Sequence, residues 1–212
     1  TGLFAGLASS TALTLNLSRA GRQQPAYRTL FAAAIVVASS MMFPRVLVLL
    51  MVVKPALLPS LLGPFILMGL TGIAISLALL WQAHSKNSDS VRAPPLNRPV
   101  DLAAAMRFGV LLSGVVLIAE AVRRFAGDVG IFIFAAISGL TDVDAITLSL
   151  VRMVDSAIEP NTAMIGIIIA ALTNTLVKLG LAAAIGGAAL GLRVGMGLGG
   201  VLIVGAGLLL WL

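Results

Sequence analysis

Cysteine is absent from the 212 residues, and histidine occurs once, as His84. The lack of cysteine excludes disulfides, thiolate catalysis and cysteine-based zinc or iron–sulfur sites, and one histidine is too few for a histidine-rich metal site. Charged residues make up only 10% of the chain, whereas 59% of it is hydrophobic. A soluble domain carries about 25% charged residues. The composition therefore excludes the class of water-soluble proteins.

The charge that is present is mostly basic, with a net charge of +6 and a sequence pI near 11.1. In a chain of mean hydropathy +1.10, we expect basic residues to lie at the boundaries of a bilayer rather than to bind nucleic acid. The chain begins at Thr1, and no charged region of a signal peptide precedes Gly2. We expect it to be processed or part of a longer polypeptide.

Apolar stretches long enough to span a membrane alternate with short polar connections. There are seven of them, at residues 2–18, 29–53, 60–82, 101–122, 129–151, 162–184 and 187–211. The sequence thus predicts an all-α polytopic membrane protein. We divide it into a first helical repeat at 1–82, a polar loop at 83–100, a linker helix at 101–128 and a second helical repeat at 129–212.

The positive-inside rule gives this plan an orientation. If the stretch 2–18 ends at the cytoplasm, the cytoplasmic side receives Arg19, Arg22, Arg28, Lys86, Arg92, Arg98, Arg107 and Arg152, and the other side receives Lys54, Arg123, Arg124 and Arg193. This excess of basic residues favours that orientation.

Two blocks of sequence recur at one offset of 133 residues, which indicates an internal repeat. Residues 6–19 read GLASSTALTLNLSR and residues 139–152 read GLTDVDAITLSLVR, with seven of fourteen positions identical. At the same offset, Ala38 to Arg45 fall on Ala171 to Lys178. We therefore expect two three-helix repeats joined by a linker helix, a 3+1+3 plan. Matching helices of the two repeats are four membrane crossings apart, so they run in the same direction and the repeats are parallel. If the stretch 2–18 or 129–151 is re-entrant rather than spanning, the repeats are inverted.

These blocks also resemble a known family. GLASSTALTLNLSR, ASSMMFPR, SGLTDVDAITLSLVR and ALTNTLVK, in this order, resemble the membrane domain of unknown function that follows MgtC/SapB-type membrane domains. The resemblance implies a multi-pass protein of the bacterial inner membrane, a transport role without a known substrate, and an MgtC-like membrane domain ahead of Thr1. The family pattern has no proline before the basic residue of the second block, where this chain has Pro44.

Ionisable residues within the apolar stretches are costly in a bilayer and mark the candidate site. Asp142 and Asp144 point about 200° apart on an ideal helix, so both serve one site only if Gly139 to Thr141 unwinds. Carboxylate and hydroxyl oxygens suit a hard cation or a proton path, whereas neutralisation of the acids by the internal bases gives a purely structural network. The predicted ion or solute site comprises Asp142, Asp144, Ser9, Ser10, Thr11, Asn174, Lys178 and Arg45.

A stripe of small residues in the last stretch predicts close helix packing. It consists of Gly187, Gly191, Gly195 and Gly199, and it packs within the subunit or along the seam of a homodimer. No motif for serine, thiol or phosphoryl chemistry is present, so we expect no enzyme and no cofactor. The favoured function is a transporter or channel-like module for a small ion or solute. The alternative is a regulatory or assembly membrane subunit that acts through helix contacts without transport.

Overall fold

The computed structural model of the chain describes residues 10–86, 129–154 and 158–211, and within these ranges the regular structure is entirely helical. This confirms the predicted all-α class. The elements are α2 (Ser10–Gln23), η1 (Pro25–Tyr27), α3 (Arg28–Ser40), α4 (Met42–Val53), η2 (Pro55–Leu57), α5 (Leu58–Lys86), a helix over Val129–Gly139, α7 (Val143–Met153), α8 (Pro160–Gly186) and α9 (Ala188–Trp211).

Four helical segments of the described chain are long and apolar enough to cross a membrane. They are Pro25–Val53, Pro55–Ala83, Pro160–Gly186 and Ala188–Leu210, and they coincide with the apolar stretches at 29–53, 60–82, 162–184 and 187–211. The linker helix predicted at 101–128 lies outside the described residues. So does most of the polar loop, although α5 continues to Lys86 and includes its first residues.

Proline and glycine set the ends of these helices. Pro25, Pro55 and Pro160 stand at the start of η1, η2 and α8, where a missing N–H costs no hydrogen bond. Gly187 ends α8 with a φ of 81°, a conformation that side chains with a Cβ rarely adopt. A turn at Met41 separates α3 from α4, and Pro44 lies in the first turn of α4. The helix breaks here because the proline ring removes the N–H that would donate to the carbonyl of Ser40 in a continuous helix.

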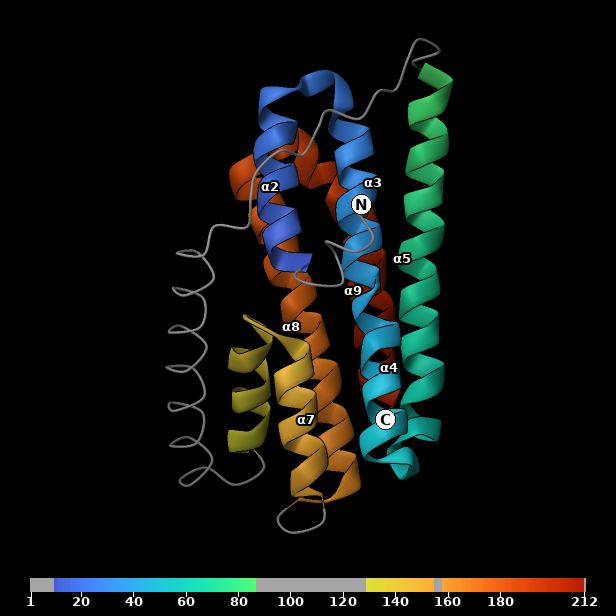
Figure 1. The fold of residues 1–212 in the computed structure, drawn as a ribbon, viewed down its shortest axis with the longest axis vertical. Helices are drawn as coiled ribbons and strands as arrows, with labels where there is room; N and C mark the ends of the chain where they lie inside the picture. The colour runs from blue at the N-terminus through green and yellow to red at the C-terminus, as the bar shows by residue number, and fades with distance from the viewer. Residues whose placement is uncertain (1–9, 87–128, 155–157, 212) are drawn as a thin grey trace.

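Two short helices start near the middle of the molecule and run to opposite ends of it (Figure 1). From its start, α2 runs to the end where η1 reverses the chain, after which α3 and α4 cross to the far end and α5 returns. α7 runs instead toward the end that holds η2. From there α8 crosses the molecule, and α9 comes back beside it.

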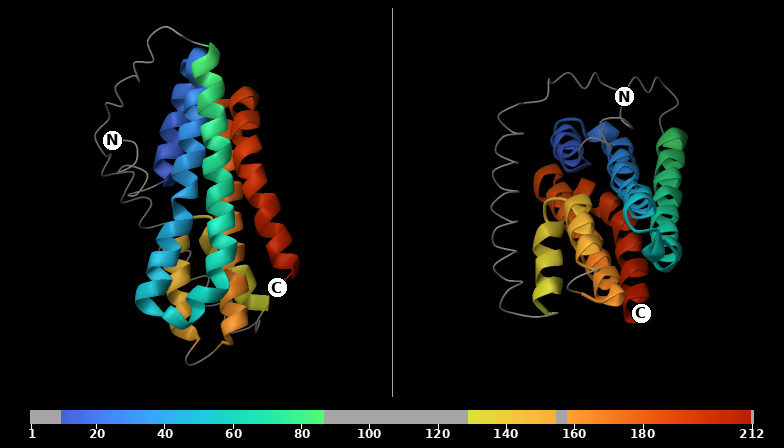
Figure 2. Two further views of the ribbon diagram at one scale, coloured as in Figure 1. Left: turned by 90° about the vertical axis from the view of Figure 1, so that its right-hand side faces the viewer. Right: turned by 60° about the horizontal axis from the view of Figure 1, so that its bottom comes forward.

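The stretch 129–151, expected as one spanning helix, is a helical hairpin. The helix over Val129–Gly139 rises to the middle of the molecule, and α7 returns beside it in the opposite direction (Figures 1 and 2). A Cβ at Gly166 of α8 would lie 2.9 Å from Leu150 and 3.7 Å from Ala135, so both arms pack at the same level of α8. The polar residues Thr141 and Asp142 break the helix, because their side chains satisfy backbone groups at the turn.

The apolar core has two parts with polar side chains between them. One cluster includes Phe43, Phe65 and Ile146, and the other includes Leu17, Ile35 and Val194. The polar residues buried between them on α3 and α8 are Ser39, Ser40, Asn174, Thr175 and Lys178. The long helices therefore hold a polar layer at about the depth where the hairpin turns.

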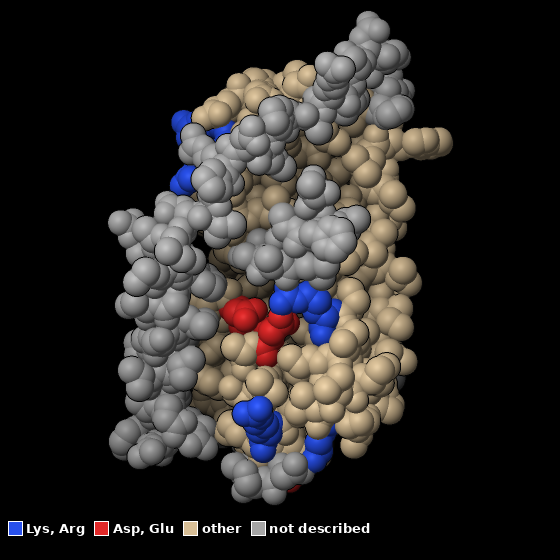
Figure 3. Space-filling model, in the orientation of Figure 1, with Lys and Arg blue, Asp and Glu red and all other residues tan. Residues whose placement is uncertain are grey.

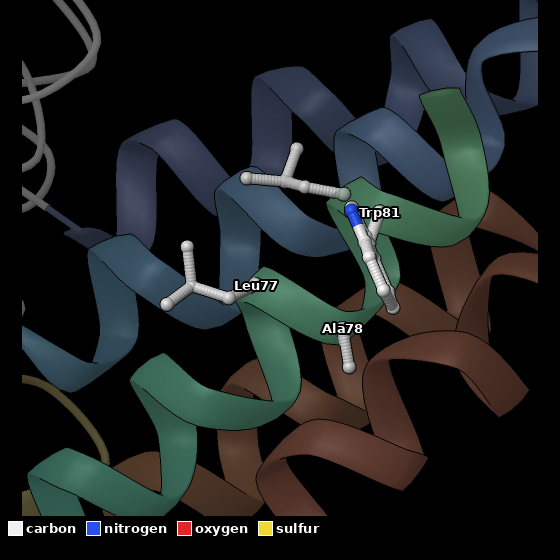
Figure 4. A pocket seen from close by; sticks show the side chains of 4 residues that line it. Leu77, Ala78 and Trp81 are labelled. Carbon is white, nitrogen blue, oxygen red and sulfur yellow. The ribbon is translucent and has the colours of Figure 1, made fainter. Parts of the chain in front are cut away.

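The outer surface of the long helices is apolar, as expected for contact with lipid. Val52 is 77% exposed, Trp81 is 85% exposed and Leu210 is 89% exposed. A shallow depression on α5, formed by Leu77, Ala78, Leu80 and Trp81, is lined almost entirely by apolar atoms (Figure 4). It lies toward the end of α5 and away from the polar layer, so it contributes nothing to the site described below.

Candidate functional site

The tip of the hairpin is fixed by hydrogen bonds and by close packing on α8. The side chain of Asp142 caps α7 by accepting from the backbone N–H of Asp144, with 3.2 Å between N and Oδ1. Asn174 of α8 donates from Nδ2 to the carbonyl oxygen of Gly139 at 2.9 Å. A Cβ at Gly139 would lie 2.5 Å from the carbonyl oxygen of Ala170, so only glycine lets the turn approach α8 this closely.

An ion pair joins the hairpin to α4. Arg45 donates from Nη2 to Oδ2 of Asp144, and the two side chains are 33% and 25% exposed. In Figure 3, basic and acidic groups meet about halfway along the visible face, which is otherwise mostly tan in its described parts. The turn at Met41 and Pro44 brings Arg45 to this position, and the polar turn at Asp142 brings Asp144 there.

Lys178 lies buried beside this pair, with only 1% of its surface exposed. Asp142 and Asp144 attract its charge, and Arg45 repels it. Among the described residues, no hydrogen bond or ion pair reaches its ammonium group. Lys178 stands one turn beyond Asn174 on α8, and residues four apart share a helix face. The structure thus brings together five of the predicted residues, namely Arg45, Asp142, Asp144, Asn174 and Lys178.

The other predicted residues belong to the first repeat. Ser9 lies outside the described residues, and Ser10 and Thr11 are half-buried in the first turn of α2. The height of this turn along α8 follows from Leu190 of α9. A Cβ added at Gly21 of α2 and one added at Gly186 of α8 would both contact this side chain, so these two glycines lie at the same height. Because α2 and α8 run in the same direction (Figure 1), residues 10–13 come level with residues 175–178.

Two buried hydroxyl groups near this layer were missed from the sequence. Thr147 of α7 and Ser18 of α2 have no hydrogen-bond partner among the described residues, although both side chains are fully buried. Thr147 is the repeat equivalent of Thr14, which is also buried and donates to the carbonyl oxygen of Ser10 at 2.8 Å. The identity of these two threonines at the shared offset was the available signal.

The predicted glycine stripe does not act as one surface. A Cβ at Gly191 would lie 2.7 Å from Ala183 of α8, and one at Gly195 would lie 3.5 Å from Leu179. Gly187 forms the turn before α9, and neither it nor Gly199 has a neighbour within 4 Å of its added Cβ. Other glycines of α9, outside the predicted stripe, approach other helices: Gly197 at Val36, Gly200 at Ile75 and Gly205 at Met68 and Leu172.

The arrangement holds two acids and two bases around a break in the backbone. In a bilayer, such a break is tolerated where it lines water or is buried in protein, and intramembrane ionisable residues usually mark ion or solute paths. Among the described residues, no group of three or more acidic, histidine or cysteine side chains has the spacing to hold a metal ion. The cluster therefore holds two acids and two bases close together, with one ion pair formed between Arg45 and Asp144.

Comparisons with known proteins give a relative and a family model for this chain. The chain is 30% identical over 184 residues to an uncharacterized protein of Aquifex aeolicus (strain VF5), which covers 86% of this chain and 79% of that protein. No solved structure matches. Residues 1–186 match the family described as a domain of unknown function, DUF4010. Since the match covers most of the sequence, the chain belongs to the DUF4010 family.

Proposed function

We propose that the chain is a transporter or channel-like module that moves a small ion or solute through the cluster of Arg45, Asp142, Asp144 and Lys178. The observation that carries the proposal is the position of this cluster. It lies where the hairpin leaves the helical conformation at membrane depth, and the Arg45–Asp144 pair there is partly exposed. Exposed charge at that depth requires water or a polar partner. A substrate path supplies such an environment.

We also infer an inverted repeat, which would support this proposal. At the offset of 133, residues 28–53, which form α3 and α4, fall on 161–186 of α8, and the break at Lys54 falls on Gly187. Because the hairpin does not cross the molecule, α7 runs opposite to α2, and α8 runs opposite to α3 and α4. The repeats are then inverted rather than parallel. Transporters of this kind place their sites near midplane, where discontinuous helices from the two repeats meet.

Flux into proteoliposomes across a panel of cations, anions and small solutes tests the function. Asp142→Asn abolishes flux if this carboxylate serves the path, and the fold is retained because asparagine caps a helix as well as aspartate does. The matched control is Glu159→Gln, an exposed acid before α8, which leaves flux unchanged. Wild-type flux together with wild-type stability in both Asp142→Asn and Asp144→Asn contradicts the proposal.

The wider setting follows from the resemblance described above. In this proposal the module works without catalysis or cofactor in the inner membrane of a bacterium, behind an MgtC-like domain, with lipid as its main surrounding. The glycine stripe leaves two arrangements to be tested, packing within the subunit and a homodimer. A purified protein that moves none of the tested solutes favours the alternative, a regulatory or assembly subunit that acts through its helix surfaces.

A further inference from the structure

We infer that the substrate is a small anion, held between Lys178 and the hydroxyl groups of the first turn of α2. This inference rests on the proposed function and names its substrate class. It starts from the charge partners in the cluster. Asp144 accepts from Arg45, and Asp142 accepts from the backbone that begins α7. Both carboxylates therefore have a partner at hydrogen-bond distance, whereas among the described residues the ammonium group of Lys178 has none.

Burial makes this difference important. Lys178 is 1% exposed, and a buried charge without a close partner costs several kcal/mol. The two acids attract Lys178, but Arg45 stands nearby and competes for the same carboxylates. Moreover, Asp142 and Asp144 lie in the first turn of α7, where the helix dipole adds about half a positive charge. Two bases and this dipole thus exceed two acids by about half a charge, so the cluster has a positive excess that attracts an anion.

The repeat indicates where that charge belongs. Arg45 of the first repeat pairs with Asp144 of the second, and their equivalents at the offset of 133 are Lys178 and Thr11. Thr11 lies within about one helical turn of the level of Lys178, because α2 and α8 pack side by side in the same direction. The base of one half therefore has its own carboxylate, whereas the repeat partner of the other base is a residue with a hydroxyl group on the neighbouring helix. An anion bound at Lys178 takes the place that Asp144 takes at Arg45.

The chemistry of the second half suits such a ligand. Lys178 supplies a compact positive charge, and the hydroxyl groups of Ser10 and Thr11 donate hydrogen bonds that a small oxyanion, carboxylate or halide accepts. A bare cation at the same place would meet Lys178 and Arg45 directly. The geometry thus favours an anion over the hard cation that the oxygen-rich sequence first suggested.

Binding is tested on the purified full chain in detergent, separately from transport. Thermal unfolding is followed in sodium phosphate, sulfate, acetate and chloride at equal ionic strength, and with sodium replaced by potassium. We expect at least one anion to raise the Tm of the wild type by roughly 2–8 °C, with no dependence on the cation. Lys178→Gln loses this shift, Lys178→Arg keeps it, and the exposed boundary control Arg19→Gln keeps it fully.

A second variant supplies the missing charge within the chain. Thr11→Asp adds a carboxylate on α2 near the level of Lys178, so we expect a higher Tm in the anion-poor buffer and no further response to the four anions. If Lys178→Gln fails to fold, Thr11→Asp still tests the anion site. A wild-type Tm indifferent to all four anions, or a full anion response in Lys178→Gln or Thr11→Asp, overturns the inference.

Flux separates this inference from the proposed function. Cation-selective flux that survives Lys178→Gln leaves the transport function standing and overturns the anion. Anion-dependent stability that requires Lys178, in a protein that moves no solute, keeps the anion site and removes the transport function. Anion flux lost in Lys178→Gln and in Thr11→Asp supports both.

Discussion

Gly139 brings the turn of the hairpin close to the backbone of α8. Its missing side chain lets the turn lie against the backbone of Ala170, where a Cβ would come within 2.5 Å of a carbonyl oxygen. Backbone does not yield as a flexible side chain does, so Gly139→Ala lifts the tip away from α8 and from the amide of Asn174. Overpacking of this kind costs about 1–3 kcal/mol, and the free energy of unfolding in detergent measures it.

Gly199 offers the matched control for this substitution. It lies in α9, and its added Cβ meets nothing within 4 Å. Alanine at an open helical position gains about 0.5–1 kcal/mol over glycine, so Gly199→Ala is expected to be neutral or stabilising. Equal stability of the two alanine variants contradicts the close contact at Ala170.

The ion pair between Arg45 and Asp144 makes a second prediction at the residue scale. Losing one partner of a fully buried pair costs about 3–5 kcal/mol, and the partial exposure of these side chains lowers the cost below that range. Arg45→Gln and Asp144→Asn should each destabilise the protein, and the double variant should lose less than the sum, with a coupling of roughly 0.5–3 kcal/mol. A double-mutant cycle on unfolding free energies measures the coupling.

The control for this cycle pairs Asp144→Asn with Arg152→Gln, an exposed base near the end of α7. Distant sites add within about 0.3–0.5 kcal/mol. Coupling to Arg45 no larger than the coupling to Arg152 would show that the pair contributes nothing specific.

At the scale of the element, the break between α3 and α4 is expected to serve function rather than stability. Pro44→Ala supplies the N–H that Ser40 lacks and lets α3 continue into α4, a gain of up to about 3 kcal/mol. Arg45 is the next residue, so the straightened helix turns it away from Asp144. We expect a higher Tm together with at least a tenfold loss of flux in proteoliposomes.

Pro64 provides a matched control for this substitution. It lies inside α5, so Pro64→Ala should also raise stability, but it should leave flux at the wild-type level because α5 contributes none of the charged cluster. Undiminished flux in Pro44→Ala would mean that the angle between α3 and α4 does not position Arg45.

The sequence predicted the long helices better than the short ones, and the reason is physical. Continuous apolar runs such as 29–53 and 162–184 satisfy their backbone only as helices, so composition alone located them. The hairpin has the same hydropathy as a single span, and its reversal depends on three-dimensional contacts of Gly139 with α8 that no local pattern contains. Asp142 was identified as costly in an apolar stretch, but its role as a helix cap emerged only from the fold.

Within the site, charge was predictable and pairing was not. Arg45, Lys178 and the two acids stood out as ionisable residues in apolar stretches. Which base meets which acid depends on the break at Met41 and on the direction of α7, and neither follows from spacing. The sequence therefore leaves two roles open for both Arg45 and Lys178, an ion or solute path and a purely structural network.

For the whole molecule, the hairpin changes which ends of the helices share a side. Because 129–151 turns back, Arg152 moves to the end of the molecule that holds Lys54, and Arg193 joins the end at which α2 finishes. Among the described residues, that second end then carries Arg19, Arg22, Arg28, Lys86 and Arg193. Since Arg152 and Arg193 exchange sides, the excess of basic residues at this end is the same as in the seven-span plan for the described residues, and the positive-inside rule still favours a cytoplasmic location for the end of α2.

The absence of cysteine makes this topology directly testable. Single cysteines at Gln23, Ala56, Glu159 and Ala188 replace exposed residues at the ends of helices. A membrane-impermeant maleimide, applied to intact cells or to vesicles of opposite orientation, should label Gln23→Cys and Ala188→Cys from one side and Ala56→Cys and Glu159→Cys from the other. If the chain instead forms seven full spans, Glu159→Cys is labelled from the same side as Gln23→Cys, and Ala188→Cys is labelled from the same side as Ala56→Cys. That exchanged pattern would contradict the hairpin and the inverted repeat that we infer from it. It would also contradict the proposed path, because a single helix over 129–151 points Asp142 and Asp144 in opposite directions.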